Sequence, residues 1–116
     1  MPLVAPLPKS WLVHTVTYQE KDKGRDAFGN DKFKEGIEIS SVRYDEQTSY
    51  ARDNTQNTLN YTGVVFVDKI NSVNVPDKFV ENSKLIFKDK TLTISRVITC
   101  YHPETDIIRH WELEVI

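Results

Sequence analysis

Several features that would point to a specific chemistry are missing from this sequence of 116 residues. Cys100 is the only cysteine, so an internal disulfide is impossible and the fold does not depend on an oxidising compartment. No apolar run approaches the roughly 20 residues that cross a membrane. The N-terminus lacks a basic stretch followed by a long apolar one, which argues against a signal peptide.

An excess of positive charge is also missing. The chain has 15 basic and 17 acidic residues, a formal net charge of −2. A protein that holds DNA tightly through phosphates needs a surplus of Lys and Arg on some surface, so this balance argues against tight phosphate binding. Hydrophobic residues make up 39% and charged residues 28%, which is typical of a globular protein with one core. The length fits a single domain, residues 1–116.

No catalytic motif stands out. The chain has no G-x-x-x-x-G-K and no G-x-G-x-x-G sequence. Cys100 lies in a predicted strand, where neighbouring side chains point to opposite faces, so we interpret it as a small strand residue. Glu112 and Glu114 share a strand face, and we interpret them as charges on the outer face of an edge strand. The sequence therefore predicts that the protein is not an enzyme.

Metal and cofactor motifs are missing as well. His14, His102 and His110 are far apart in the sequence, and no C-x-x-C or H-x-x-x-H spacing links them with Cys100. We interpret His110 as a surface residue of the last strand. The sequence predicts no metal site and no cofactor.

What is present is a series of short segments rich in β-branched and aromatic residues, which fit a pleated sheet. They predict about six strands and no helix longer than about ten residues. We therefore expect an all-β fold, a small single-domain β-barrel or sandwich with long polar loops. The expected strands are 11–18, 37–44, 62–68, 85–88, 91–101 and 107–116.

Connecting segments and core positions follow from the same pattern. Prolines predict an extended N-terminal arm over residues 1–9. Residues 19–32 and 45–58 are predicted as long polar loops; eight of the fourteen residues in 19–32 are charged. Apolar residues change parity at Ser40-Ser41, which predicts a β-bulge there that turns Ile37, Ile39, Val42 and Tyr44 to one face. The expected core includes Trp11, Val65, Phe87, Ile94, Ile98, Trp111 and Leu113.

Four segments together carry a resemblance to a known family. They are PLPKSWL at 6–12, FVDKINS at 66–72, ISRV at 94–97 and HWELEV at 110–115. In this order and spacing the chain resembles, over essentially its whole length, the minor capsid proteins of phages that infect Gram-positive bacteria. That family looks like the head-completion, or stopper, proteins of long-tailed bacteriophages.

The resemblance implies a structural protein of the virion, assembled in the host cytoplasm, at the junction of head and tail. Stopper proteins form a homo-oligomeric ring below the portal and its adaptor, help to retain packaged DNA and offer a docking surface to the tail. Double-stranded DNA would pass through without specific binding. By position, loop 45–58 is our candidate for lining the channel, and loop 19–32 is second. The candidate interaction residues are Asp45, Gln47, Tyr50, Arg52, Asp53, Lys21, Lys23, Arg25 and Phe28.

Other functions stay open at this point. A tail-terminator or another neck protein would have similar sequence features. A free β-barrel module that binds an oligonucleotide or a small ligand would need a basic groove or a titratable cavity, and the sequence shows neither. Strand aromatics such as Tyr18 and Phe66 could stack on bases, but core packing explains such residues more often.

Overall fold

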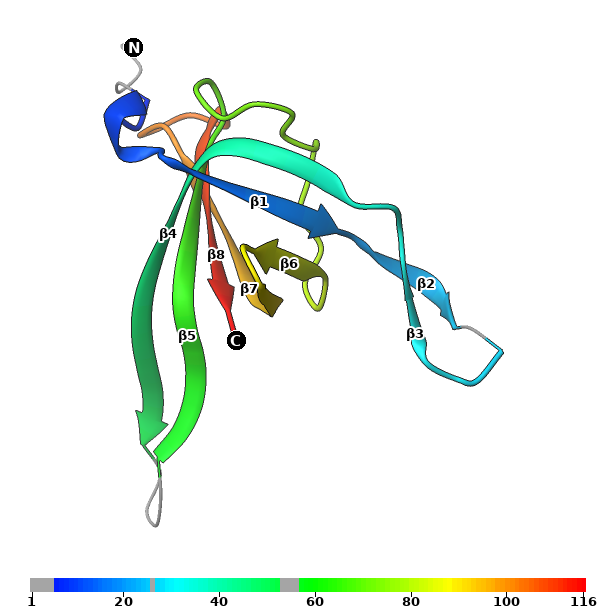
Figure 1. Ribbon diagram of the computed structural model, residues 1–116. Helices are drawn as coiled ribbons and strands as arrows, with labels where there is room; N and C mark the ends of the chain where they lie inside the picture. Colours follow the sequence, from blue (N-terminus) through cyan, green and yellow to red (C-terminus); the bar gives the residue numbers. More distant parts are fainter. Residues whose placement is uncertain (1–5, 26, 53–56) are drawn as a thin grey trace.

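The computed structural model describes residues 6–25, 27–52 and 57–116. Six antiparallel strands close into a barrel in the order β1-β4-β5-β8-β7-β6, and β6 pairs back to β1 (Figure 1). The predicted all-β fold is thereby confirmed, and of the two expected architectures, barrel and sandwich, the chain adopts the barrel. The barrel strands are β1 His14–Gln19, β4 Ile37–Arg52, β5 Asn57–Asp68, β6 Lys84–Phe87, β7 Lys90–Tyr101 and β8 Ile108–Val115. No helix in the described part of the chain has the length and apolar character of a membrane span.

The barrel interior is filled by alternating side chains of the six strands. Phe79, from the connection between β5 and β6, closes the interior and makes edge-to-face contacts with Tyr18 and Trp111 at ring-centroid distances of 5.1 and 5.4 Å. Five of the expected core residues are confirmed as buried: Val65, Phe87, Ile94, Trp111 and Leu113.

A β-bulge occurs where the change of parity predicted it. His14 pairs with Val42 while Thr15 pairs with Ser40, which leaves Ser41 unpaired with a φ of 56°. The extra residue lets both Ile39 and Val42 point into the barrel, where neither is exposed. Ile37 is paired with the buried Tyr18 and therefore shares this face, but it lies at the first position of β4 and stays 37% exposed.

A second bulge explains why the expectation for Ile98 was wrong. Ile94 pairs with Val115 and Arg96 with Glu114, so Ser95 is an extra residue in β7. The parity of β7 changes there, and Ile98 faces Glu112 on the outside of the barrel. Ile98 is therefore only partly buried.

Trp11 is also outside the core. A short 3-10 helix, η1 Lys9–Trp11, precedes β1, and it is closed by bonds from the Trp11 and Leu12 amides to the Pro8 and Lys9 carbonyls. β1 consequently begins at His14 rather than at Trp11, and the Trp11 side chain is 55% exposed. Leu12, one residue later, is buried in its place.

Both segments expected to be polar loops contain strand. In the region 19–32, β2 Lys21–Arg25 and β3 Asp31–Phe33 form a separate two-stranded sheet. In the region 45–58, β4 and β5 continue as a paired hairpin beyond the barrel, with Arg52 opposite Asn57 (Figure 1). Pairing between two strands satisfies the hydrogen bonds of their backbone N–H and C=O groups whatever the side chains are. A polar composition therefore does not exclude strands here. Residues 53–56 lie outside the described part.

Candidate functional site: the outer face of β4, β5, β8 and β7

Outward side chains of four adjacent strands lie in register across the barrel wall. Arg43 of β4 is paired with Phe66 of β5, Phe66 with Glu112 of β8, and Glu112 with Ile98 of β7. Directly paired residues of neighbouring strands point to the same face, so these four side chains form one row. β8 lies between β5 and β7, so Glu112 is on an internal strand of the barrel. The prediction that it lies on an edge strand was wrong.

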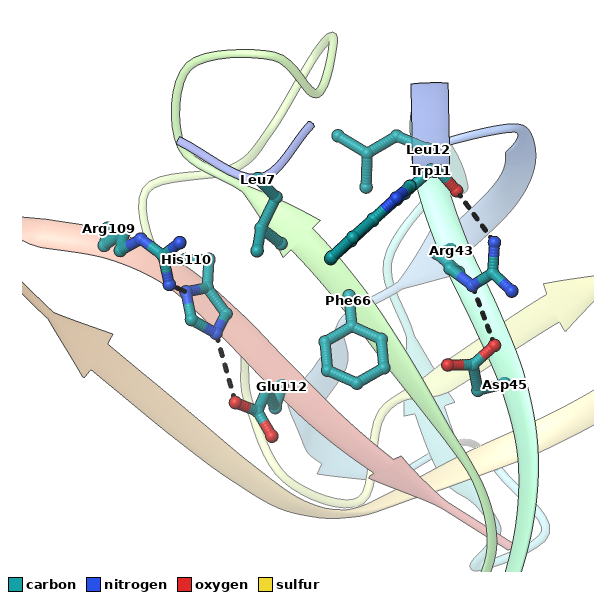
Figure 2. Close-up of a pocket in the computed structure, with 9 residues that line it drawn as sticks. All are labelled: Leu7, Trp11, Leu12, Arg43, Asp45, Phe66, Arg109, His110 and Glu112. Atoms are coloured by element: carbon teal, nitrogen blue, oxygen red, sulfur yellow. Dashed lines mark hydrogen bonds and ion pairs between the residues drawn. The ribbon is translucent and has the colours of Figure 1, made fainter. Parts of the chain in front are cut away.

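A pocket of about 520 Å³ lies over three members of this row, Arg43, Phe66 and Glu112, between the sheet and the N-terminal segment. Figure 2 shows the Trp11 ring directed toward Phe66, with Leu7 on the other side of the opening. The pocket thus has an aromatic floor and walls made partly by the chain that precedes β1. It is lined by Leu7, Trp11, Leu12, Arg43, Asp45, Phe66, Arg109, His110 and Glu112.

One buried carboxylate holds the N-terminal wall in place. The Leu7 amide donates to Asp68 Oδ1 at 2.9 Å, and the Ile70 and Asn71 amides donate to Oδ2 at 2.9 and 2.7 Å. The Asn71 side-chain amide in turn donates to the Leu7 carbonyl at 2.8 Å. Asp68 therefore joins the end of β5 to the segment that covers the pocket.

Charges of both signs flank the pocket. Arg43 Nε donates to Asp45 Oδ1 at 2.8 Å, and Arg43 Nη1 lies 3.4 Å from the Trp11 carbonyl. On the opposite side of the pocket, Arg109 and Glu112 line the wall together with His110 (Figure 2). Two guanidinium groups and two carboxylates leave the lining without the positive surplus that phosphate binding requires.

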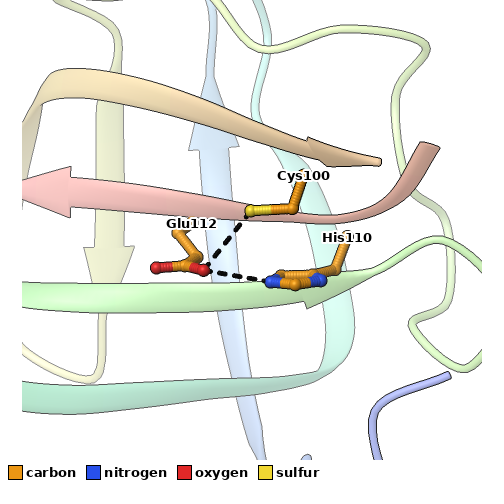
Figure 3. A group of neighbouring side chains, drawn as sticks. All are labelled: Cys100, His110 and Glu112. Carbon is orange, nitrogen blue, oxygen red and sulfur yellow. Dashed lines mark hydrogen bonds and ion pairs between the residues drawn. The ribbon is translucent and has the colours of Figure 1, made fainter. Parts of the chain in front are cut away.

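Beside the pocket, Cys100, His110 and Glu112 form a cluster whose nearest donor atoms all lie within 4.8 Å of one another (Figure 3). Cys100 Sγ donates to Glu112 Oε2 at 3.4 Å, and His110 Nε2 lies 3.1 Å from the same oxygen. Burial of the thiol, its hydrogen bond to Glu112 and the charge of that carboxylate raise the pKa of Cys100 to about 11. The thiol is therefore protonated at neutral pH.

Sequence analysis missed this cluster for an identifiable reason. Cys100 and His110 are ten residues apart in the sequence, but they are direct partners in the β7–β8 ladder. Only the register of the hairpin places them together, and the sequence does not state that register. The expectation that His110 is a surface residue was wrong, because it is only 7% exposed.

The expected interaction residues of 45–58 are spread along the long hairpin, which is the part of β4 and β5 that projects beyond the barrel. Asp45 lies in the pocket wall. Gln47, Tyr50 and Arg52 belong to the distal part of β4, and Asp53 lies outside the described residues.

The expected interaction residues of 19–32 lie on the β2–β3 hairpin, which points away from the long hairpin (Figure 1). Lys21 Nζ pairs with Asp31 at 3.8 Å, Lys23 is exposed, and Arg25 is the last residue of β2. Phe28, in the turn, is 88% exposed. The structure therefore does not bring the eight described members of this set into one site, whereas Trp11 and Phe66, which it does bring together, were not expected there.

Comparison with known proteins identifies a family. A family model described as "Minor capsid protein" matches residues 8–115, almost the whole chain. No curated protein and no solved structure matches.

Proposed function

Because this chain belongs to the family of phage minor capsid proteins, and is accordingly a virion-associated structural protein, we propose that it is a head-completion, or stopper, protein. It forms a homo-oligomeric ring between the portal–adaptor assembly and the tail, and it helps to retain packaged DNA. The observation that carries this proposal is the pair of hairpins that extend from a closed barrel in two different directions. A ring subunit needs such a rigid body with projections that reach its neighbours and the channel.

The composition of the long hairpin suits it to line the channel through which DNA passes. Residues 47–61 contain only two charged side chains, Arg52 and Asp53, of opposite sign. A neutral polar surface offers DNA no strong phosphate contacts, so a DNA molecule passing through the ring can slide. This hairpin contains most of the segment 45–58 that the sequence favoured for the same role.

The β2–β3 hairpin is suited to contacts between subunits. It presents charges of both signs, including the pair of Lys21 with Asp31, and an exposed aromatic residue, Phe28. Mixed charge beside an aromatic anchor is common at protein interfaces. Identical hairpins repeated around a ring would meet the same surface on each neighbour.

Electron microscopy of phage particles made without this protein tests the proposal. We expect heads that have lost their DNA, together with separate tails of normal length. DNA-filled heads accompanied by tails of abnormal length would instead indicate a tail terminator. Normal infectious particles would exclude any neck role.

A module that binds oligonucleotides is less well supported. The pocket does place Trp11 and Phe66 where bases could stack. Its two carboxylates, Asp45 and Glu112, oppose the backbone phosphates that would accompany those bases. Titration with single-stranded oligonucleotides, followed by tryptophan fluorescence, would reveal such binding.

A further inference from the structure

The cluster of Cys100, His110 and Glu112 has no part in the ring role. From its composition and geometry we infer that these three side chains bind one zinc ion on the outer face of the barrel. The inference is independent of the proposed stopper function, because it rests only on the donor atoms and their arrangement.

The donor set suits zinc and excludes the hard cations. A thiolate, an imidazole and a carboxylate are the three side-chain ligands that proteins use for Zn²⁺. Calcium and magnesium take oxygen ligands, so Cys100 and His110 disfavour both ions. His110 is almost fully buried within the barrel wall, and Cys100 is partly buried, so neither is an incidental surface group.

The separations fit a tetrahedral ion. Zinc bonds of about 2.0–2.3 Å place neighbouring ligand atoms about 3.3–3.6 Å apart. The observed distances from Glu112 Oε2 are 3.4 Å to Cys100 Sγ and 3.1 Å to His110 Nε2. The third separation, between Cys100 Sγ and a ring nitrogen of His110, is within 4.8 Å. Small side-chain rotations are therefore enough to bring all three atoms around one ion.

The backbone holds the three ligands in position. Cys100 and His110 are paired across β7 and β8, and Glu112 is two residues after His110 on the same face. Binding requires two proton movements: the Cys100 thiol loses its proton to solvent, and the His110 ring carries its proton on Nδ1 so that Nε2 is free. Arg109 Nη1, which lies 3.4 Å from His110 Nδ1, then has to turn away.

Three protein ligands leave a fourth coordination position. His110 and Glu112 also line the pocket, so the ion would lie at the pocket wall. Water fills such a position in an isolated protein. The arrangement is that of an open site, which can accept a further ligand from a molecule that enters the pocket.

Metal titration of the full chain, after treatment with a chelator, tests this inference. We expect saturable binding of one Zn²⁺ per chain. Cobalt should bind in the same place and give the thiolate-to-metal absorption band of a tetrahedral site. Cys100→Ser should abolish that band, and His110→Gln and Glu112→Gln should each weaken binding at least about tenfold.

Glu114→Gln is the matched control, because Glu114 lies on the same strand and face, two residues beyond Glu112, and outside the cluster. It should bind zinc as the unchanged protein does. Circular dichroism of each metal-free variant establishes that the barrel is folded. Absence of saturable binding by the unchanged protein would overturn the inference. A cobalt band that persists in Cys100→Ser, or an equal loss in Glu114→Gln, would do the same.

Discussion

At the scale of single residues, the buried carboxylate of Asp68 connects β5 to the N-terminal segment. It accepts three backbone amide hydrogens, including that of Leu7. Asp68→Ala leaves these donors without their acceptor, and we expect a loss of about 1–3 kcal/mol in the free energy of unfolding. Amide exchange of Leu7 should accelerate because its hydrogen bond is lost. Denaturant titration and hydrogen exchange measure the two effects.

Asp77→Ala is the control for this substitution, since Asp77 is an exposed carboxylate in the same connection. It should change stability by no more than about 0.5 kcal/mol. An Asp68→Ala protein as stable as this control would show that the carboxylate does not anchor the segment.

Cys100 gives a second prediction, on reactivity. Its pKa of about 11 leaves little thiolate near neutral pH. We expect alkylation by iodoacetamide at pH 8 to be at least about tenfold slower than that of an ordinary thiol, even after allowance for the greater nucleophilicity of a basic thiolate. The rate should keep rising above pH 9, where a thiol of ordinary pKa levels off. Alkylation in denaturant provides the reference, and a plateau near pH 8.5 in the folded protein would contradict the raised pKa.

At the scale of elements, β4 and β5 come close together where Tyr44 lies over Gly63. A Cβ at position 63 would be 2.7–2.9 Å from atoms of the Tyr44 ring, whose centroid is 4.9 Å from that of Phe87. Gly63→Ala therefore has to displace a packed ring, and we expect it to lower the free energy of unfolding by about 1–3 kcal/mol.

Gly24→Ala provides the comparison, because its added Cβ would meet only the Lys32 side chain, at an ordinary 3.9 Å. Thermal unfolding should distinguish the two variants clearly. Equal melting temperatures of the two variants would contradict this prediction, because they would mean that the Tyr44 ring is displaced without a loss of stability.

The elements also show what the sequence could and could not predict. Alternation identified β8 and the inward side chains Trp111 and Leu113, and a change of parity located the bulge at Ser41. The bulge at Ser95 was missed because Val97 and Ile98 are both apolar, so either parity is plausible there. The cluster of Cys100, His110 and Glu112 was missed because it depends on the register of the β7–β8 hairpin, which the sequence alone does not reveal.

At the scale of the whole molecule, the barrel and its hairpins have separate roles. The distal pairs, from Ser49 with Tyr61 to Arg52 with Asn57, have no third strand among the described residues. A variant in which residues 49–60 are replaced by a short turn should therefore keep the barrel core. We expect it to unfold at a similar denaturant concentration and yet to yield particles that lose DNA, as measured by nuclease sensitivity of the packaged genome.

Hydrogen exchange provides a second measurement on the same hairpin. Its amides should exchange faster than those of the barrel in free protein, because few contacts protect them, and they should become protected in assembled necks. If the shortened variant gives infectious particles with their full genome, the hairpin has no part in DNA retention.

The course of β4 from the barrel into the projection has a mechanical consequence. The same 16-residue strand forms barrel wall at one end and projecting hairpin at the other, a length of about 50 Å at the usual rise per residue. The pairing with β5 is irregular between Glu46 and Tyr50, where the barrel wall passes into the projection. A bulge is where a strand bends, so a sideways load on the projection bends the strand there first. Arg43 and Asp45 lie on the barrel side of this bend, so the pocket keeps its shape under such a load.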